Sequence, residues 1–189
     1  MRFPDKLIDK ISDGEPFNIE DRETLIYGVD IIFYTIWSTA LLLLIGLLLK
    51  QFYAAVFIVF GFYALQSHGG GYHAKTHLKC LLTMIFGLLF GLAWVYIGDR
   101  TRVLYSIFAV SLLILLLFPL VLHPNKAYIR DESRRLTVIS ILITTAVSIS
   151  GLLLFKYFHL PLYVLSVTFF LAAVSRIAGK IVYSYQEAK

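Results

Sequence analysis

Apolar segments long enough to cross a bilayer dominate this sequence and most constrain its fold. Hydrophobic residues make up 59% of the 189-residue chain and charged residues only 15%, and the mean hydropathy is +0.78. Soluble domains carry about 45–50% apolar and about 25% charged residues, so this composition excludes that class. The predicted membrane-spanning segments are Ile31–Leu49, Phe52–Leu65, Leu81–Gly98, Val103–Leu122, Leu136–Phe155 and Leu160–Ser175.

The predicted fold is an all-α integral membrane protein of about six transmembrane helices, in a single membrane-embedded domain over residues 1–189. The second segment, Phe52–Leu65, is shorter than the roughly 20 residues of a full crossing, so a short, tilted or re-entrant helix is expected there. Ahead of the first span, Phe3–Ser12 has apolar residues at helical spacing and charged residues on the other side. This pattern predicts an amphipathic helix on the membrane surface, within a cytoplasmic-face N-terminal region of residues 1–28.

Lys and Arg are distributed unevenly among the polar stretches. With six crossings and a cytoplasmic N-terminus, 13 of the 17 fall on the cytoplasmic side, as the positive-inside rule expects. Both termini and the polar loops 67–79 and 123–135 then face the cytoplasm. The net charge of +5 therefore indicates topology and partnership with a lipid bilayer, not nucleic-acid binding. The exceptions, on the outer side, are Lys50, Arg100, Arg102 and Lys156.

The stretch Ser67–Cys80 concentrates polar chemistry between two apolar segments. It holds the only cysteine, three of the five histidines and a run of three glycines. Ionisable side chains at the end of a membrane-spanning segment indicate a functional site. Cysteine with histidine suggests a nucleophile and its base, because the thiolate is the reacting form. Thr76 is a plausible helix cap, which would put Cys80 in the first turns of the third span.

Spacing alone does not decide which histidine serves Cys80. His77 is three residues away and could reach it within a helix. His73 is seven residues away, so it must lie outside the helix, and the glycines could let the chain fold back. A metal site of His73, His77 and Cys80 is a competing interpretation. A backbone amide of Gly70 or Gly71 could donate to an oxyanion, or the glycines could form a plain turn.

Two motifs resemble the accessory gene regulator B (AgrB) family of bacterial membrane cysteine peptidases. Gly70–Cys80 reads Gly-Gly-Tyr-His-Ala-x-Thr-x-x-x-Cys, and a proline at Pro119 precedes His-Pro-Asn-Lys at His123–Lys126. The plan of a polar N-terminal region and about six apolar segments is also similar. The resemblance covers essentially the whole chain.

The resemblance implies an enzyme, a thiol protease of the bacterial cell membrane that acts in quorum sensing. Such an enzyme cleaves an AgrD-type precursor peptide through a thioester and promotes its cyclisation to a thiolactone or lactone. By position, Cys80 is the nucleophile and His73 the general base and acid, whereas His77 has no counterpart. The resemblance also suggests a homodimer and counts against a metal. No cofactor is expected, and the distribution of positive charge puts the active site at the cytoplasmic face.

The chain departs from the family just before the glycines, where Gln66 and Ser67 replace the usual arginines. Other residues are then expected to hold the acidic tail of the precursor by charge. Asn125 is a candidate for substrate binding and, like Asp131, for orienting His73. The basic candidates are Lys75, Lys79, Lys126, Arg130, Arg134 and Arg135.

A small membrane transporter or channel component without peptidase activity is the alternative function. Six spans and an intramembrane proline would be ordinary in such a protein. It predicts polar residues throughout several spans, whereas the predicted span interiors hold little beyond Ser and Thr.

Overall fold

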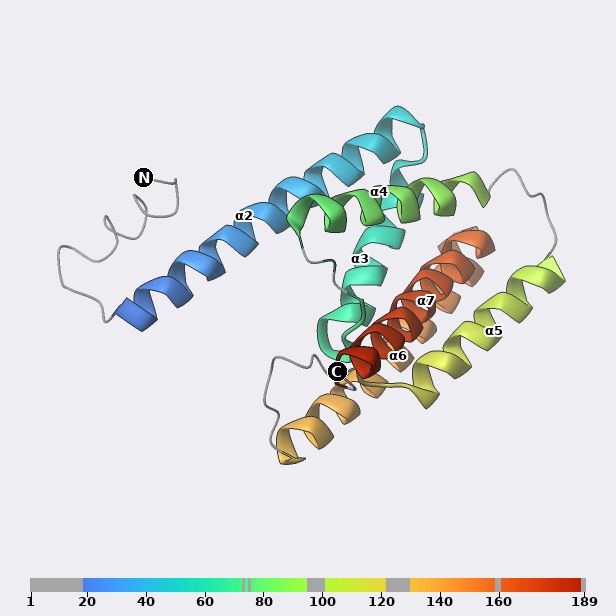
Figure 1. Cartoon of the computed structure of the whole chain (residues 1–189). Coiled ribbons are helices and arrows are strands. Elements are labelled where there is room, and N and C mark those ends of the chain that lie inside the picture. Colours follow the sequence, from blue (N-terminus) through green and yellow to red (C-terminus); the bar gives the residue numbers. More distant parts are fainter. Residues whose placement is uncertain are drawn as a thin grey trace. The chain divides into compact units, whose positions relative to one another are not determined.

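A computed structural model describes residues 19–72, 74, 76–94, 101–121, 130–158 and 161–187. These residues form helices and no strands, which confirms the predicted all-α fold (Figure 1). The predicted amphipathic helix at Phe3–Ser12 lies outside them. The helices are α2 (Ile19–Leu48), α3 (Phe52–Gly69), α4 (His77–Ala93), α5 (Thr101–Leu117), α6 (Arg130–Phe158) and α7 (Leu162–Glu187).

Four of the described helices, α2, α3, α6 and α7, are long and apolar enough to cross a membrane. This agrees with the predicted membrane class. Helices α4 and α5 are apolar too, but each has only 17 residues. Helix α3 has 18 residues and includes Gln66–Gly69 beyond the apolar segment that marks it in the sequence. The count of six crossings and the single domain stay predictions.

Helix α5 ends earlier than the sequence suggests. The predicted fourth span runs to Leu122, but the helix stops at Leu117, before Pro119. A residue that precedes proline is disfavoured in the α conformation, and here that residue is Phe118. The proline therefore ends the helix, and its last carbonyls need other partners.

Helix α7 continues well past the end of its apolar sequence. The sixth span is predicted to end near Ser175, and this is wrong because the helix runs to Glu187. Arg176 and Tyr183 therefore lie within a helix, and both are buried. Their burial against the rest of the protein explains how the helix continues through polar sequence.

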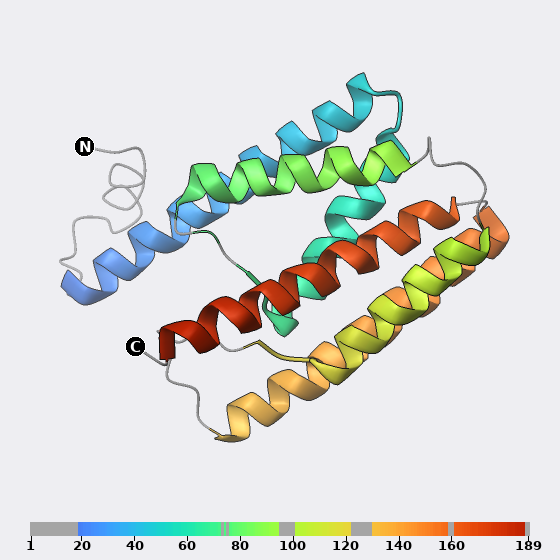
Figure 2. The ribbon, with the colours of Figure 1, turned by 45° about the vertical axis from the view of Figure 1, so that its right-hand side comes forward.

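The chain divides into two compact units, residues 1–41 and residues 42–189. In the second unit α7 is central, because it packs against α3, α4, α5 and α6. Figure 2 shows α7 running between α4 on one side and α5 and α6 on the other. Its apolar span is 61% buried within the protein, against 33% for α3 and 22% for α6. The other helices of this unit are thus placed relative to α7.

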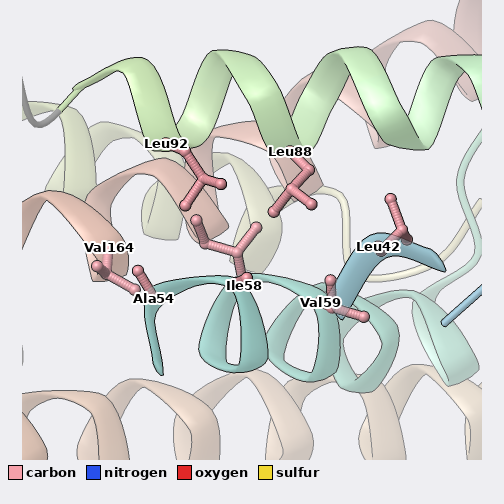
Figure 3. Packing of buried hydrophobic residues seen from close by; sticks show 8 residues of the cluster. Leu42, Ala54, Ile58, Val59, Leu88, Leu92 and Val164 are labelled. Atoms are coloured by element: carbon pink, nitrogen blue, oxygen red, sulfur yellow. The ribbon is translucent and has the colours of Figure 1, made fainter. Parts of the chain in front are cut away.

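Apolar side chains fill the junction of α3, α4 and α7. Leu88 and Leu92 of α4 point toward Ile58 of α3 (Figure 3), and all three are at most 2% exposed. Gly91 lets the helices approach closely, since a Cβ there would lie 2.9 Å from Cγ1 of Val167. Close packing of this kind is what joins helices in lipid, where the surrounding solvent is as apolar as the side chains.

Gln51, just before α3, joins three elements by its side chain. Its Nε2 donates to the carbonyl of Leu92 at 3.4 Å, and its Oε1 accepts from the Tyr163 hydroxyl at 3.1 Å. Helices α3 and α7 are therefore tied to the C-terminal end of α4. The polar Ser67–Cys80 stretch begins at the other end of α3.

Candidate active site

Thr76 caps the helix that carries Cys80, as the sequence predicts. Its backbone is extended, with φ −134° and ψ 147°, and its side chain accepts a hydrogen bond from the Lys79 amide at 3.4 Å. The Cys80 amide donates to the Thr76 carbonyl at 3.0 Å. Cys80 thus lies in the first turn of α4, where unpaired amides and the helix dipole favour negative charge.

Cys80 is half-buried, although Leu78 and Lys79 beside it are exposed. Its position four residues before Met84 places the two on one face of the helix. That face packs toward α3, because Met84 accepts from the Tyr63 hydroxyl at 3.7 Å. The sulfur is therefore carried on the protein-facing side of α4, at its polar end.

The three glycines form a tight turn at the end of α3. Gly70 has φ +66°, and its amide donates to the Gln66 carbonyl at 3.0 Å. The Val121 amide, beyond α5, donates to the Gly69 carbonyl at 2.8 Å. A Cβ on Gly70 would overlap the Val121 carbonyl oxygen, so both the positive φ and the available space require glycine. This turn is therefore packed between the end of α3 and the residues that follow α5.

Beyond the turn, the chain docks along α7. The Tyr72 amide donates to the Ser175 carbonyl at 2.9 Å and lies 3.2 Å from its Oγ. The Tyr183 hydroxyl donates to the Gly71 carbonyl at 3.2 Å. Gly179 makes room between these two contacts, since a Cβ there would be 2.8 Å from the carbonyl carbon of Gly71. Ser175, Gly179 and Tyr183 follow one another at four-residue spacing and so share a helix face.

Arg176, the residue after Ser175, is fully buried at the end of this bundle. Its guanidinium lies against Gly69 and donates to oxygens from α3, the end of α5 and α6. Carbonyls at a helix C-terminus lack helical partners and carry partial negative charge, so they suit a buried cation. The acceptors are the carbonyls of Leu115 (3.0 Å), Phe118 (3.1 Å) and Pro119 (3.0 Å) for Nη1, and the Leu65 carbonyl (2.7 Å) and Ser140 Oγ (3.2 Å) for Nη2.

Comparison with protein-family models identifies the family of this chain. The family model described as accessory gene regulator B matches residues 5–177. This chain belongs to the AgrB family. Neither the search of curated proteins nor the search of solved structures found a match. Membership in the AgrB family supports a role in processing quorum-sensing peptides.

Some of the residues that the AgrB resemblance singles out lie outside the described part of the chain. These are His73, Lys75, Asn125 and Lys126, together with the side chain of Arg130. Arg134 and Arg135 are exposed in the second turn of α6, as is Asp131 in its first. Figure 2 shows the start of α6 at the same end of the bundle as the ends of α3, α5 and α7. Among the described residues, no three His, Cys, Asp or Glu side chains form a metal-ligand group.

Sequence reasoning missed the burial of Arg176 against the glycine turn of this AgrB-family protein. The apolar sequence predicts that the sixth span ends at Ser175, which places Arg176 among the cytoplasmic positive charges. A local signal was present: Arg176 follows Ala172-Ala173-Val174-Ser175 and precedes Ile177-Ala178, and an ionisable residue in such an apolar helix needs a polar partner. The roles of Ser175 and Tyr183 had no comparable signal, since both types are common in helices.

Proposed function

We propose that this protein is a membrane cysteine peptidase and cyclase that acts on an AgrD-type precursor peptide. The observation that carries the proposal is the position of Cys80, the chain's only cysteine, in the capped first turn of α4. Family membership supplies the substrate class. A nucleophile at a helix start benefits from the dipole while staying near water and charged partners.

The proposed reaction has two acyl transfers. His73 takes the thiol proton of Cys80, and the thiolate sulfur attacks the scissile carbonyl of the precursor. The tetrahedral intermediate collapses as His73 protonates the departing amine, which leaves the N-terminal part of the peptide as a thioester on Cys80. A Cys or Ser of the same peptide then loses its proton to His73 and attacks the thioester. The ring forms, and the proton returns to Cys80.

The oxyanion of each tetrahedral intermediate needs a donor. Of the two glycines considered, the Gly70 amide already donates to the Gln66 carbonyl. It could serve only if that bond breaks, so Gly71 is the better candidate. Partial exclusion of water at the protein-facing side of α4 would favour transfer to the peptide's own nucleophile over hydrolysis.

The precursor is expected to reach the site along the membrane. An amphipathic peptide adsorbed on the cytoplasmic leaflet searches a plane, which raises its effective concentration near Cys80. The exposed guanidinium groups of Arg134 and Arg135 could attract its acidic tail. With Asn125, Lys126 and Arg130, they are the proposed substrate-binding residues, and a homodimer with cytoplasmic termini is the proposed form.

Co-expression with the short peptide encoded nearest to this chain tests the proposal. We expect Cys80→Ala and His73→Ala each to abolish precursor cleavage while membrane insertion is retained. His77→Ala is the matched control and should leave cleavage intact. Cleavage that continues in Cys80→Ala would contradict the proposal, and so would loss of cleavage in His77→Ala with His73→Ala active.

A further inference from the structure

The backbone from Gly69 to Tyr72 is held on several sides by α7, and we infer that Arg176 is a positioning residue for the reaction. By fixing this segment, Arg176 sets where the chain enters residue 73 relative to the helix that carries Cys80. The inference rests on the proposed function, because it concerns the same His73 and Cys80.

The guanidinium joins α3, α5 and α6 at one end of the bundle. Its Nη1 bonds the carbonyls left unpaired where α5 stops, including that of Leu115, and its Nη2 bonds the Leu65 carbonyl of α3 and Ser140 of α6. Gly69 fits directly against it, since a Cβ there would overlap Nη2 and Cζ of Arg176. Only a planar group with donors in two directions can serve both sets of acceptors, which distinguishes arginine from lysine here.

Helix α7 also holds the residues that follow Gly69 by hydrogen bonds. Ser175 accepts the Tyr72 amide and Tyr183 donates to the Gly71 carbonyl, so the chain is fixed up to Tyr72. Thr76 fixes the chain again through its cap on α4. Only residues 73–75 connect Tyr72 to Thr76, and each residue spans at most about 3.6 Å. A displacement of Tyr72 is therefore passed to that short connection.

The test measures alkylation of Cys80 by iodoacetamide as a function of pH, on the full-length protein in lipid nanodiscs. Cys80 is the only cysteine, so the signal has one source. His73→Ala should slow alkylation at neutral pH and move the rise in rate to higher pH, because the proposed base is removed. We expect Arg176→Lys to move it the same way, with a neutral-pH rate lowered about tenfold. Tyr183→Phe should produce a smaller shift.

Two variants serve as matched controls. Arg102→Lys changes an exposed arginine near the start of α5, and Tyr157→Phe removes an exposed hydroxyl from α6. Both should keep the wild-type profile. A purely structural role for Arg176 would expose Cys80 and raise its rate at every pH, without moving the profile.

The outcomes separate the two proposals. If His73→Ala moves the profile but Arg176→Lys and Tyr183→Phe keep it, the positioning role is wrong and the proposed function stands. If His73→Ala leaves the profile unchanged, both are overturned. Should Arg176→Lys fail to fold, as judged by gel filtration, Ser140→Ala takes its place, because it removes one acceptor of the guanidinium and leaves Arg176 itself unchanged.

Discussion

Nη2 of Arg176 lies directly against the α-carbon of Gly69, so the fully buried cation of the last helix touches the turn that ends α3. Any side chain at residue 69 would displace the guanidinium from the acceptors it shares between α3, α5 and α6.

Gly69→Ala should therefore destabilise the protein by about 1–3 kcal/mol, because the added methyl overpacks a filled site. Thermal unfolding in detergent would measure the loss. Gly28→Ala is the control, since a Cβ there meets nothing within 4 Å. That change should be neutral or slightly stabilising, because alanine is the better helix former. Equal effects of the two substitutions would contradict the packing argument.

Thr76→Ala should loosen the start of α4 by about 0.5–2 kcal/mol, the usual cost of removing an N-cap side chain. Amide hydrogen exchange at Lys79 should speed up, since its amide loses the Thr76 acceptor. Thr76→Ser should largely restore protection. If exchange at Lys79 is the same in Thr76→Ala as in the wild type, the cap does not hold this turn.

A substitution of Gln51, at the other end of the bundle, should lower the stability of the protein without changing the reactivity of Cys80. Gln51→Leu removes the bonds to Leu92 and Tyr163, each worth about 0.5–1.5 kcal/mol. We expect a lower unfolding temperature, but an unchanged pH profile of Cys80 alkylation. A shifted profile would mean that the two ends are coupled, against this expectation.

Charge reversal at Arg134 and Arg135 tests substrate steering. The double change to Glu should lower the rate of precursor cleavage about tenfold at low ionic strength, and the difference should shrink as salt screens the charges. Lys156→Glu, at the far end of α6, is the control and should have little effect. The steering hypothesis fails if the reversed protein cleaves as fast as the wild type at low salt.

Local chemistry in the sequence predicted the parts of this structure that depend on neighbouring residues. The Thr76 cap follows from a hydroxyl placed just before an apolar run, and the run of glycines permits the positive φ that Gly70 adopts. The all-α fold follows from the apolar segments. In each case the determining contact lies within a few residues along the chain.

Contacts between residues far apart in the sequence determine the structural features that the sequence did not predict. Hydropathy falls after Ser175 and predicts the end of the span there, yet α7 continues, because Arg176 and Tyr183 bond to residues far away in the sequence, such as Leu115 and Gly71. Likewise, α3 continues through Gln66–Gly69, and the Gly69 carbonyl at its end accepts from the Val121 amide. Such pairings need the three-dimensional arrangement of the helices.

The docking of Gly71 and Tyr72 along α7 has a consequence for biosynthesis. Cys80 and its capped turn are translated long before Ser175, Arg176 and Tyr183, which hold the glycine turn in place. A nascent chain that has not yet released its last helix from the ribosome therefore carries the thiol without the support beside it. The glycine turn of a nascent chain therefore gains these contacts only after α7 has left the ribosome.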